Sequence, residues 1–274
     1  MIKLQNIKIG SGNPLVLIAG PCVVESRELT LRTADRISKI TKKHNVPFIF
    51  KSSYKKANRT SSFSFSTIGM HESLRILSEI KSEFDVPILT DIHTESEAAV
   101  AAEVADILQI PAFLCRQTEL LQAAGRTGKI INIKKGQFLA PEDMKHQADK
   151  VISTGNKKVM LTERGTTFGY HNLVVDMRSL QIMHELGHPV ILDATHSVQL
   201  PGAGKGETSG SPEFIFPISR AGVAVGIDGL FLEVHPDPKR ALSDAASQLK
   251  LDLLEELIKQ VAEIDKLVKT KLKM

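Results

Sequence analysis

The chain has few of the residues on which several large classes of protein depend. Among its 274 residues there are two cysteines, Cys22 and Cys115, and no tryptophan. Two cysteines cannot form a disulfide framework, which predicts a reducing compartment. Aromatic residues make up only 5% of the chain, and this argues against the stacking surfaces that bind single-stranded nucleic acid.

Long apolar runs and blocks of one charge are also missing. No hydrophobic run is long enough to span a membrane, and the first ten residues, MIKLQNIKIG, lack the apolar core of a signal peptide. The net charge of +4 is spread along the chain rather than gathered into a Lys/Arg block. We therefore expect a cytoplasmic protein with no nucleic-acid or membrane partner.

Eight short apolar runs recur along the chain, and helix-like stretches separate them. Several runs are apolar throughout, as strands buried on both faces are. They cover residues 14–20, 47–53, 87–93, 106–111, 130–135, 159–165, 189–196 and 229–235. This alternation predicts a single (β/α)8 TIM barrel as one domain over 1–274, with the first dozen residues as a cap on the bottom of the barrel. A doubly wound sheet is the alternative, but GPCVVES after the first run is not a dinucleotide-binding glycine pattern.

Charged residues follow several of the predicted strands, at the end where barrel enzymes carry their chemistry. The cations among them are Lys51, Lys56, Arg59, Lys134 and Arg164. Cations brought to one face repel one another unless an anion is bound. The sequence therefore predicts a cavity for a multiply charged ligand or for two anionic ligands, although single lysines could instead point to solvent.

Cys22 stands at the exit of the first predicted strand, in PLVLIAGPC. It could be a packed core residue, a nucleophile or a metal ligand. Together with His196, Glu233 and Asp244 it offers thiolate, imidazole and carboxylate groups, a set that suits zinc or ferrous iron. No C-x-x-C or H-E-x-x-H spacing supports this set, so the residues alone leave the metal site and the packed cysteine both open. Cys115 has no comparable partners and is predicted to be structural.

The chain resembles the 3-deoxy-D-manno-octulosonate 8-phosphate synthases, also called 2-dehydro-3-deoxyphosphooctonate aldolases, over nearly its whole length. The resemblance is carried by AGPCVVES, FKSSYKKANRTS, INIKKGQF, VILDATHSVQLPG and GLFLEVHPDP. It implies condensation of phosphoenolpyruvate with arabinose 5-phosphate for lipopolysaccharide (Kdo) biosynthesis, in a homotetramer. The alternative is the related 3-deoxy-arabino-heptulosonate 7-phosphate synthases, which use erythrose 4-phosphate. The KANRT segment at 56–60 favours the octulosonate enzymes, because a K-P-R-T-[ST] segment is expected in the others.

The resemblance also implies a metal and a set of roles. The cysteine in the GPC turn is typical of the metal-dependent form of the family, whose other form carries asparagine there. It implies one divalent ion per chain, Zn²⁺, Fe²⁺ or Mn²⁺, held by Cys22, His196, Glu233 and Asp244. The catalytic groups that it implies are His196, Asp244, Lys56 and Asp91, and either His196 or Asp244 moves the proton of the attacking water.

Substrate contacts follow from the same resemblance. The phosphoenolpyruvate carboxylate is expected on Lys51, Ser53 and Lys56. Its phosphate is expected on Lys134, Arg164 and the backbone near Ala112, with Gln109 beside it. Arabinose 5-phosphate is expected on Asn58, Arg59, Thr60 and Asp91.

Two interpretations from other classes remain open. A Schiff-base aldolase needs a lysine with a depressed pKa, which a ring of cations can provide. A non-catalytic anion-binding barrel would keep its metal as a closed structural site.

Overall fold

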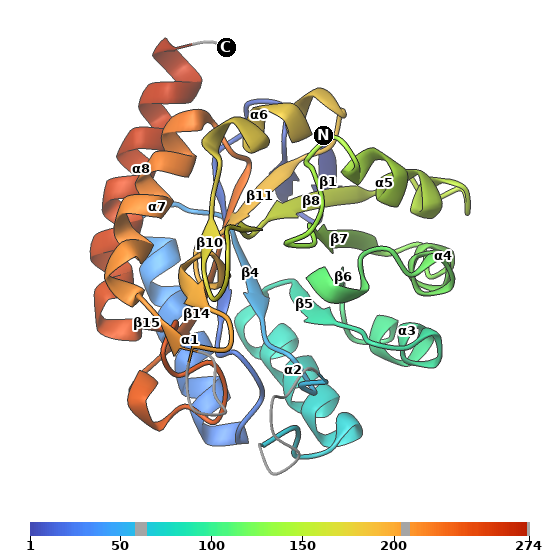
Figure 1. The fold of residues 1–274 in the computed structure, drawn as a ribbon. Coiled ribbons are helices and arrows are strands. Elements are labelled where there is room, and N and C mark those ends of the chain that lie inside the picture. Colours follow the sequence, from blue (N-terminus) through green and yellow to red (C-terminus); the bar gives the residue numbers. More distant parts are fainter. Residues whose placement is uncertain (58–64, 204–208, 273–274) are drawn as a thin grey trace.

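The computed structural model describes residues 1–57, 65–203 and 209–272, so Asn58, Arg59 and Thr60 lie outside the described residues. In the described part of the chain, eight parallel strands form a closed barrel, and eight helices surround it (Figure 1). The strands are β3 (Val16–Gly20), β4 (Phe48–Lys51), β5 (Ile88–Asp91), β6 (Ile107–Ile110), β7 (Ile130–Lys134), β8 (Val159–Glu163), β11 (Val190–Asp193) and β14 (Gly229–His235). The helices are α1 (Arg27–Lys43), α2 (Met70–Phe84), α3 (Glu95–Ala102), α4 (Thr118–Arg126), α5 (Met144–Ile152), α6 (Met177–Glu185), α7 (Ile215–Val225) and α8 (Leu254–Lys271).

The barrel closes because β14 pairs in parallel on both of its edges. Leu230 lies opposite Leu17 of β3 on one side and opposite Leu192 of β11 on the other. Each residue of the eight barrel strands is buried. Such continuous burial is the pattern of a parallel sheet that is covered by helices outside and packed with side chains inside. The (β/α)8 barrel predicted from the sequence is confirmed.

The first residues form an antiparallel hairpin of β1 (Ile2–Leu4) and β2 (Ile7–Ile9). Its side chains alternate between buried and exposed, and Ile9 is fully buried. The buried face packs in one apolar cluster with residues inside the barrel, including Val16 and Ile130. These two residues begin their strands, so the hairpin covers the amino-terminal end of the barrel, as the sequence predicted.

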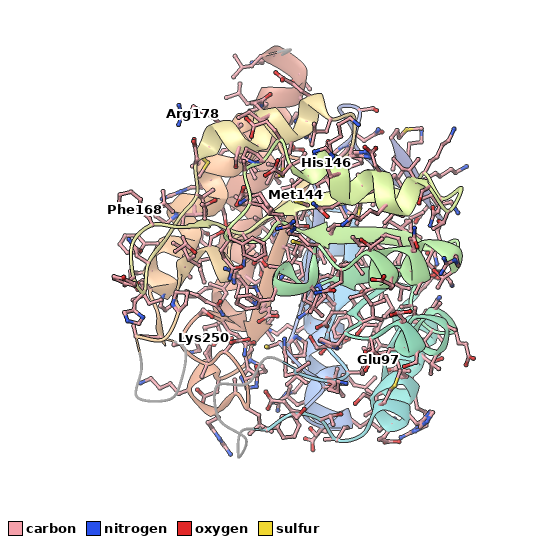
Figure 2. All side chains as sticks on the ribbon, turned by 45° about the vertical axis from the view of Figure 1, so that its right-hand side comes forward. Glu97, Met144, His146, Phe168, Arg178 and Lys250 are labelled. Atoms are coloured by element: carbon pink, nitrogen blue, oxygen red, sulfur yellow. The ribbon has the colours of Figure 1, made fainter. Side chains whose placement is uncertain are left out.

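The helices turn one apolar face to the barrel and a polar face outward. Figure 2 shows this on α5, where Met144 is buried and His146 is exposed. Helix α1 begins where it does because Ser26 Oγ accepts a hydrogen bond from the Leu29 N–H, which satisfies a free donor of the first turn. None of the helices in the described ranges is both long and apolar enough to cross a membrane.

Short extra strands follow the carboxyl ends of the barrel strands. The pairs are β9 (Thr166–Thr167) with β10 (Leu173–Val174) and β12 (Gln199–Leu200) with β13 (Ser209–Gly210), and β15 (Leu249–Lys250) pairs in parallel with the end of β14. They follow β8, β11 and β14 in the chain, and Gln199 lines the principal cavity. The local additions to the barrel therefore build the end at which the predicted site lies.

Candidate active site

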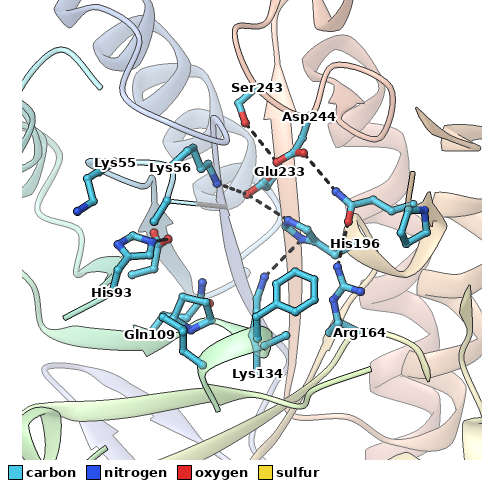
Figure 3. A pocket seen from close by; sticks show the side chains of 18 of the residues that line it. Lys55, Lys56, His93, Gln109, Lys134, Arg164, His196, Glu233, Ser243 and Asp244 are labelled. Atoms are coloured by element: carbon cyan, nitrogen blue, oxygen red, sulfur yellow. Dashed lines mark hydrogen bonds and ion pairs between the residues drawn. The ribbon is translucent and has the colours of Figure 1, made fainter. Parts of the chain in front are cut away.

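A cavity of about 860 Å³ opens at the carboxyl ends of the strands (Figure 3). Gln109, Ala112 and His196 line it, as the sequence predicted. The described lining also carries five cations and three carboxylates, which are Lys51, Lys55, Lys56, Lys134, Arg164, Asp91, Glu233 and Asp244. The described lining therefore carries a net positive charge, but the carboxylates make that charge smaller than the cations alone suggested.

Three of the four predicted metal ligands lie together. One ligand atom each from Cys22, Glu233 and Asp244 lies within 4.8 Å of the other two. Cys22 Sγ is 2.9 Å from Asp244 Oδ2 and 3.0 Å from Ser243 Oγ. Cys22 reaches this position because Gly20 lets the end of β3 approach β4 closely. A Cβ atom on Gly20 would lie 2.0 Å from the backbone oxygen of Lys51.

The electrostatics of this cluster fit a cation. Burial raises the pKa of the Cys22 thiol well above its usual value, and the charges of Asp244 and Glu233 raise it further. Glu233 Oε2 is buried and has no hydrogen-bond partner among the described residues. A divalent ion would satisfy that oxygen and favour the thiolate, and thiolate with carboxylates is a donor set for borderline metals. The residues present fit the predicted metal.

His196 lies beside this group rather than in it. Its Nε2 is 3.9 Å from Glu233 Oε1, and its Nδ1 is 2.7 Å from Asp193 Oδ2. The backbone N–H of His196 also donates to Asp193 Oδ1 at 2.9 Å. Asp193 therefore fixes the ring with Nε2 turned toward Glu233, in the manner of the carboxylate partners of metal-binding histidines. The assignment of His196 as the fourth ligand stays a prediction.

Lys134 and Arg164 form another wall of the cavity. Lys134 Nζ is 2.5 Å from Asp193 Oδ2 and 4.1 Å from the centroid of the Phe231 ring. Arg164 Nη2 donates to Gln199 Oε1 at 2.9 Å, whereas its Nη1 is buried without a partner in the described part of the chain. Burial lowers the pKa of both cations. An anion between them would satisfy the free nitrogen and offset the cost of burial.

The residues that were predicted to bind a substrate carboxylate lie at the end of β4 and in the segment that follows it. Lys51 Nζ is 2.6 Å from Glu233 Oε1, and Lys56 Nζ is 3.7 Å from the same oxygen. Burial disfavours the charge on Lys56, but the nearby negative groups outweigh it and hold its pKa well above the usual value. Ser53 Oγ is buried with no partner among the described residues, and Ser53 is not one of the residues that line the cavity.

Sequence reasoning assigned no role to three residues that organise the site. Asp193 orients His196, Ser243 contacts the Cys22 thiol, and Gln199 bonds Arg164 through Oε1 and Asp244 through Nε2 at 3.3 Å. Asp193 carried a signal, since it ends a strand three residues before His196. A glutamine in a two-residue strand and a serine in a bend carry none.

A (β/α)8 barrel that gathers cations, carboxylates and a thiol at the carboxyl ends of its strands has the features of a barrel enzyme that acts on anionic substrates. The DAHP synthetase I family matches residues 1–270 of the chain. The chain is 54% identical over 268 residues to a protein of Geobacter sulfurreducens, covering 98% of each. It is 55% identical over 269 residues to one of Trichlorobacter lovleyi, covering 98% of each. It is 53% identical over 271 residues to one of Rickettsia rickettsii, covering 99% of each.

All three relatives are named 2-dehydro-3-deoxyphosphooctonate aldolase. The chain therefore belongs to the DAHP synthetase I family. The resemblance to the octulosonate phosphate synthases that its motifs predicted is confirmed.

Proposed function

We propose that the protein condenses phosphoenolpyruvate with D-arabinose 5-phosphate and water. The products are 3-deoxy-D-manno-octulosonate 8-phosphate and phosphate, in the pathway to Kdo and lipopolysaccharide. The shared name of the relatives supports this reaction. The structural observation that carries it is the convergence of five cations on one cavity whose carboxylates Glu233 and Asp244 also group with the Cys22 thiol. Two anionic substrates that react with each other must lie side by side, and such a lining can hold both.

Phosphoenolpyruvate is proposed to lie between the two cationic walls. Lys51, Ser53 and Lys56 hold its carboxylate, and the position of Lys51 and Lys56 in the cavity lining supports this role. Lys134, Arg164 and the backbone of Ala112 hold its phosphate. Gln109 lies beside it, and its Oε1 accepts a hydrogen bond from Asn132 Nδ2 at 3.1 Å. Asn58, Arg59, Thr60 and Asp91 receive the sugar phosphate.

The bond changes define what the side chains must do. The enol carbon attacks the aldehyde carbon of the sugar, water adds at the carbon that bears the phosphate, and the phosphate leaves with its carbon–oxygen bond broken. Lys134 and Arg164 stabilise the negative charge on the departing phosphate. Because both are held in place before the reaction, by Asp193 and Gln199, they need little rearrangement as that charge develops.

A divalent ion, Zn²⁺, Fe²⁺ or Mn²⁺, would be held by Cys22, Glu233 and Asp244, with His196 as the fourth ligand. When bound, such an ion supplies a positive charge that orients water or polarises an aldehyde. Asp193 holds His196 in one orientation, and Gln199 does the same for Asp244. One of these two groups, His196 or Asp244, takes the proton of the attacking water.

A cytoplasmic homotetramer is part of this proposal. The family resemblance supports the tetramer, and two buried, unpaired cysteines agree with a reducing compartment.

The reaction is tested by measuring phosphate release from phosphoenolpyruvate with arabinose 5-phosphate, beside the same assay with erythrose 4-phosphate. We expect strong preference for arabinose 5-phosphate, because of the KANRT segment at 56–60. Comparable turnover of both sugars would contradict the assignment and favour the heptulosonate alternative. Borohydride added during turnover tests the Schiff-base alternative, and we expect no trapped lysine adduct.

A further inference from the structure

A second network of charged side chains connects Asp91 to His93 and Glu97. Asp91 ends β5 and is buried, and its Oδ2 is 3.1 Å from His93 Nε2. Its Oδ1 is buried and has no hydrogen-bond partner among the described residues. On the other side of the imidazole, Nδ1 lies 3.5 Å from Glu97 Oε2, which is a charge contact rather than a good hydrogen bond. The imidazole is thus placed between two carboxylates.

Glu97 connects this imidazole to the segment that follows the preceding barrel strand, β4. It lies in the first turn of α3 (Figure 2), where its Oε2 accepts the N–H groups of His93 at 2.7 Å and Thr94 at 3.2 Å. The same oxygen accepts the Tyr54 hydroxyl at 2.7 Å, and Oε1 accepts Lys55 Nζ at 2.7 Å. The Tyr54 ring also packs edge-on against the His93 ring, with centroids 6.2 Å apart. One carboxylate therefore joins the segments that follow β4 and β5.

Helix capping accounts for only part of these contacts. The capping box of α3 needs Thr94 and Glu97 alone. The bonds from Tyr54 and Lys55 come from the segment that follows β4, and they hold the pKa of the Glu97 carboxyl down at about 2 although burial raises it. A buried, charged carboxylate with this many donors keeps the groups around it in one arrangement.

We propose that His93 and Glu97 are positioning residues, which hold Asp91 with Oδ1 free toward the sugar and fix the segment that carries Lys56. The inference rests on the proposed function, because it takes the ligand of Asp91 to be arabinose 5-phosphate. His93 touches Asp91 directly, so its effect falls on the sugar. Glu97 touches both segments, so its effect falls on both substrates.

A double-mutant cycle tests the part played by His93. We expect His93→Ala to lower kcat/KM for arabinose 5-phosphate by about 10- to 100-fold, the cost of one hydrogen bond to a charged group. The KM for phosphoenolpyruvate should change little. In an Asp91→Asn background, His93→Ala should lower kcat/KM for arabinose 5-phosphate by less than about threefold, because the effects of residues that act through one another are not additive. The cycle is run at single-turnover enzyme concentrations, so that large losses stay measurable.

Conservative variants separate positioning from folding. His93→Gln keeps a donor near the place of Nε2 and should recover most of the activity, and Glu97→Gln should raise the KM of both substrates. Glu95→Gln, an exposed position in the same turn of α3, is the matched control and should behave as wild type. If His93→Ala does not fold, His93→Phe, which keeps a ring against Tyr54 but has no donor for Asp91, enters the cycle in its place, and melting curves accompany each variant.

The inference would be overturned if the losses in kcat/KM of His93→Ala and Asp91→Asn added up in the double variant. It would also be overturned if His93→Ala impaired the use of both substrates equally. Either result would leave the network as a structural cap. A wild-type enzyme that releases no phosphate from the two substrates would instead overturn the proposed function, and the inference with it. The two failures are thus distinguishable.

Discussion

Cys22 carries the most distinctive chemistry of any single residue in the site. Its thiol is buried against two carboxylates, and burial together with their charges opposes formation of the thiolate unless a divalent ion is bound. We expect Cys22→Ala to lose the metal and most of the activity, because the soft donor is removed. Cys22→Asn should lose tight metal binding but keep more chelator-resistant activity, since its amide can form hydrogen bonds where the metal was held. Metal content per chain and phosphate release, measured on the same samples, check both expectations.

Cys115→Ala is the control for Cys22. Cys115 is also buried, but among the described residues it does not belong to the group of possible metal ligands that contains Cys22, so its removal should leave the metal content unchanged. Equal metal loss in both cysteine variants would mean that Cys22 acts on folding and not on the metal.

Among the elements, the N-terminal hairpin of β1 and β2 is expected to contribute to stability and not to activity. Ile9 is fully buried against residues inside the barrel, at the end opposite to the cavity. Ile9→Ala should destabilise the protein by about 2–5 kcal/mol, because it removes a packed side chain and leaves a cavity. The kcat at a temperature well below melting should hardly change. Thermal melting and initial rates measure the two effects.

Lys8→Ala is the matched control for Ile9, because it lies on the same strand and is exposed. It should leave the melting temperature close to that of wild type. A large fall in kcat for Ile9→Ala at low temperature would show that the hairpin communicates with the site, which the fold does not predict.

At the scale of the whole molecule, the group of candidate metal ligands Cys22, Glu233 and Asp244 is an addition to a core that is complete without it. The apolar core is built from strands and helices around the entire barrel, whereas the cluster comes from the ends of β3 and β14 and the loop after β14. We therefore expect a chelator to abolish activity reversibly and leave the fold intact. Circular dichroism, sedimentation velocity and activity, measured before and after chelation, check this and report the proposed tetramer.

Unfolding on chelation would favour the structural-zinc interpretation. Full activity after verified removal of the metal would contradict the metal hypothesis and leave Cys22 as a packed residue.

The amino-acid sequence by itself determined the barrel. The pattern of apolar residues is a local property of the sequence, so the eight apolar runs, such as 130–135 for β7 (Ile130–Lys134), predicted the strands to within a few residues. The ends of those runs also predicted most of the charged residues around the cavity. The cap at the bottom was predicted too, although not as an antiparallel hairpin. The organisation as one domain over 1–274 stays a prediction.

Only the tertiary structure decided how the charged residues pair. Lys51 lies 182 positions from Glu233 in the chain, and only closure of the barrel between β14 and β3 brings their side chains together. Asp244 reaches the cluster through a left-handed backbone conformation, with φ of 48°. The pattern of apolar residues in the sequence does not predict such a conformation. The pairing of Asp193 with His196, and the links through Gln199 and Glu97, arise in the same way. Hydrogen bonds and ion pairs act over a few ångströms in space, whereas sequence patterns report only on neighbours along the chain.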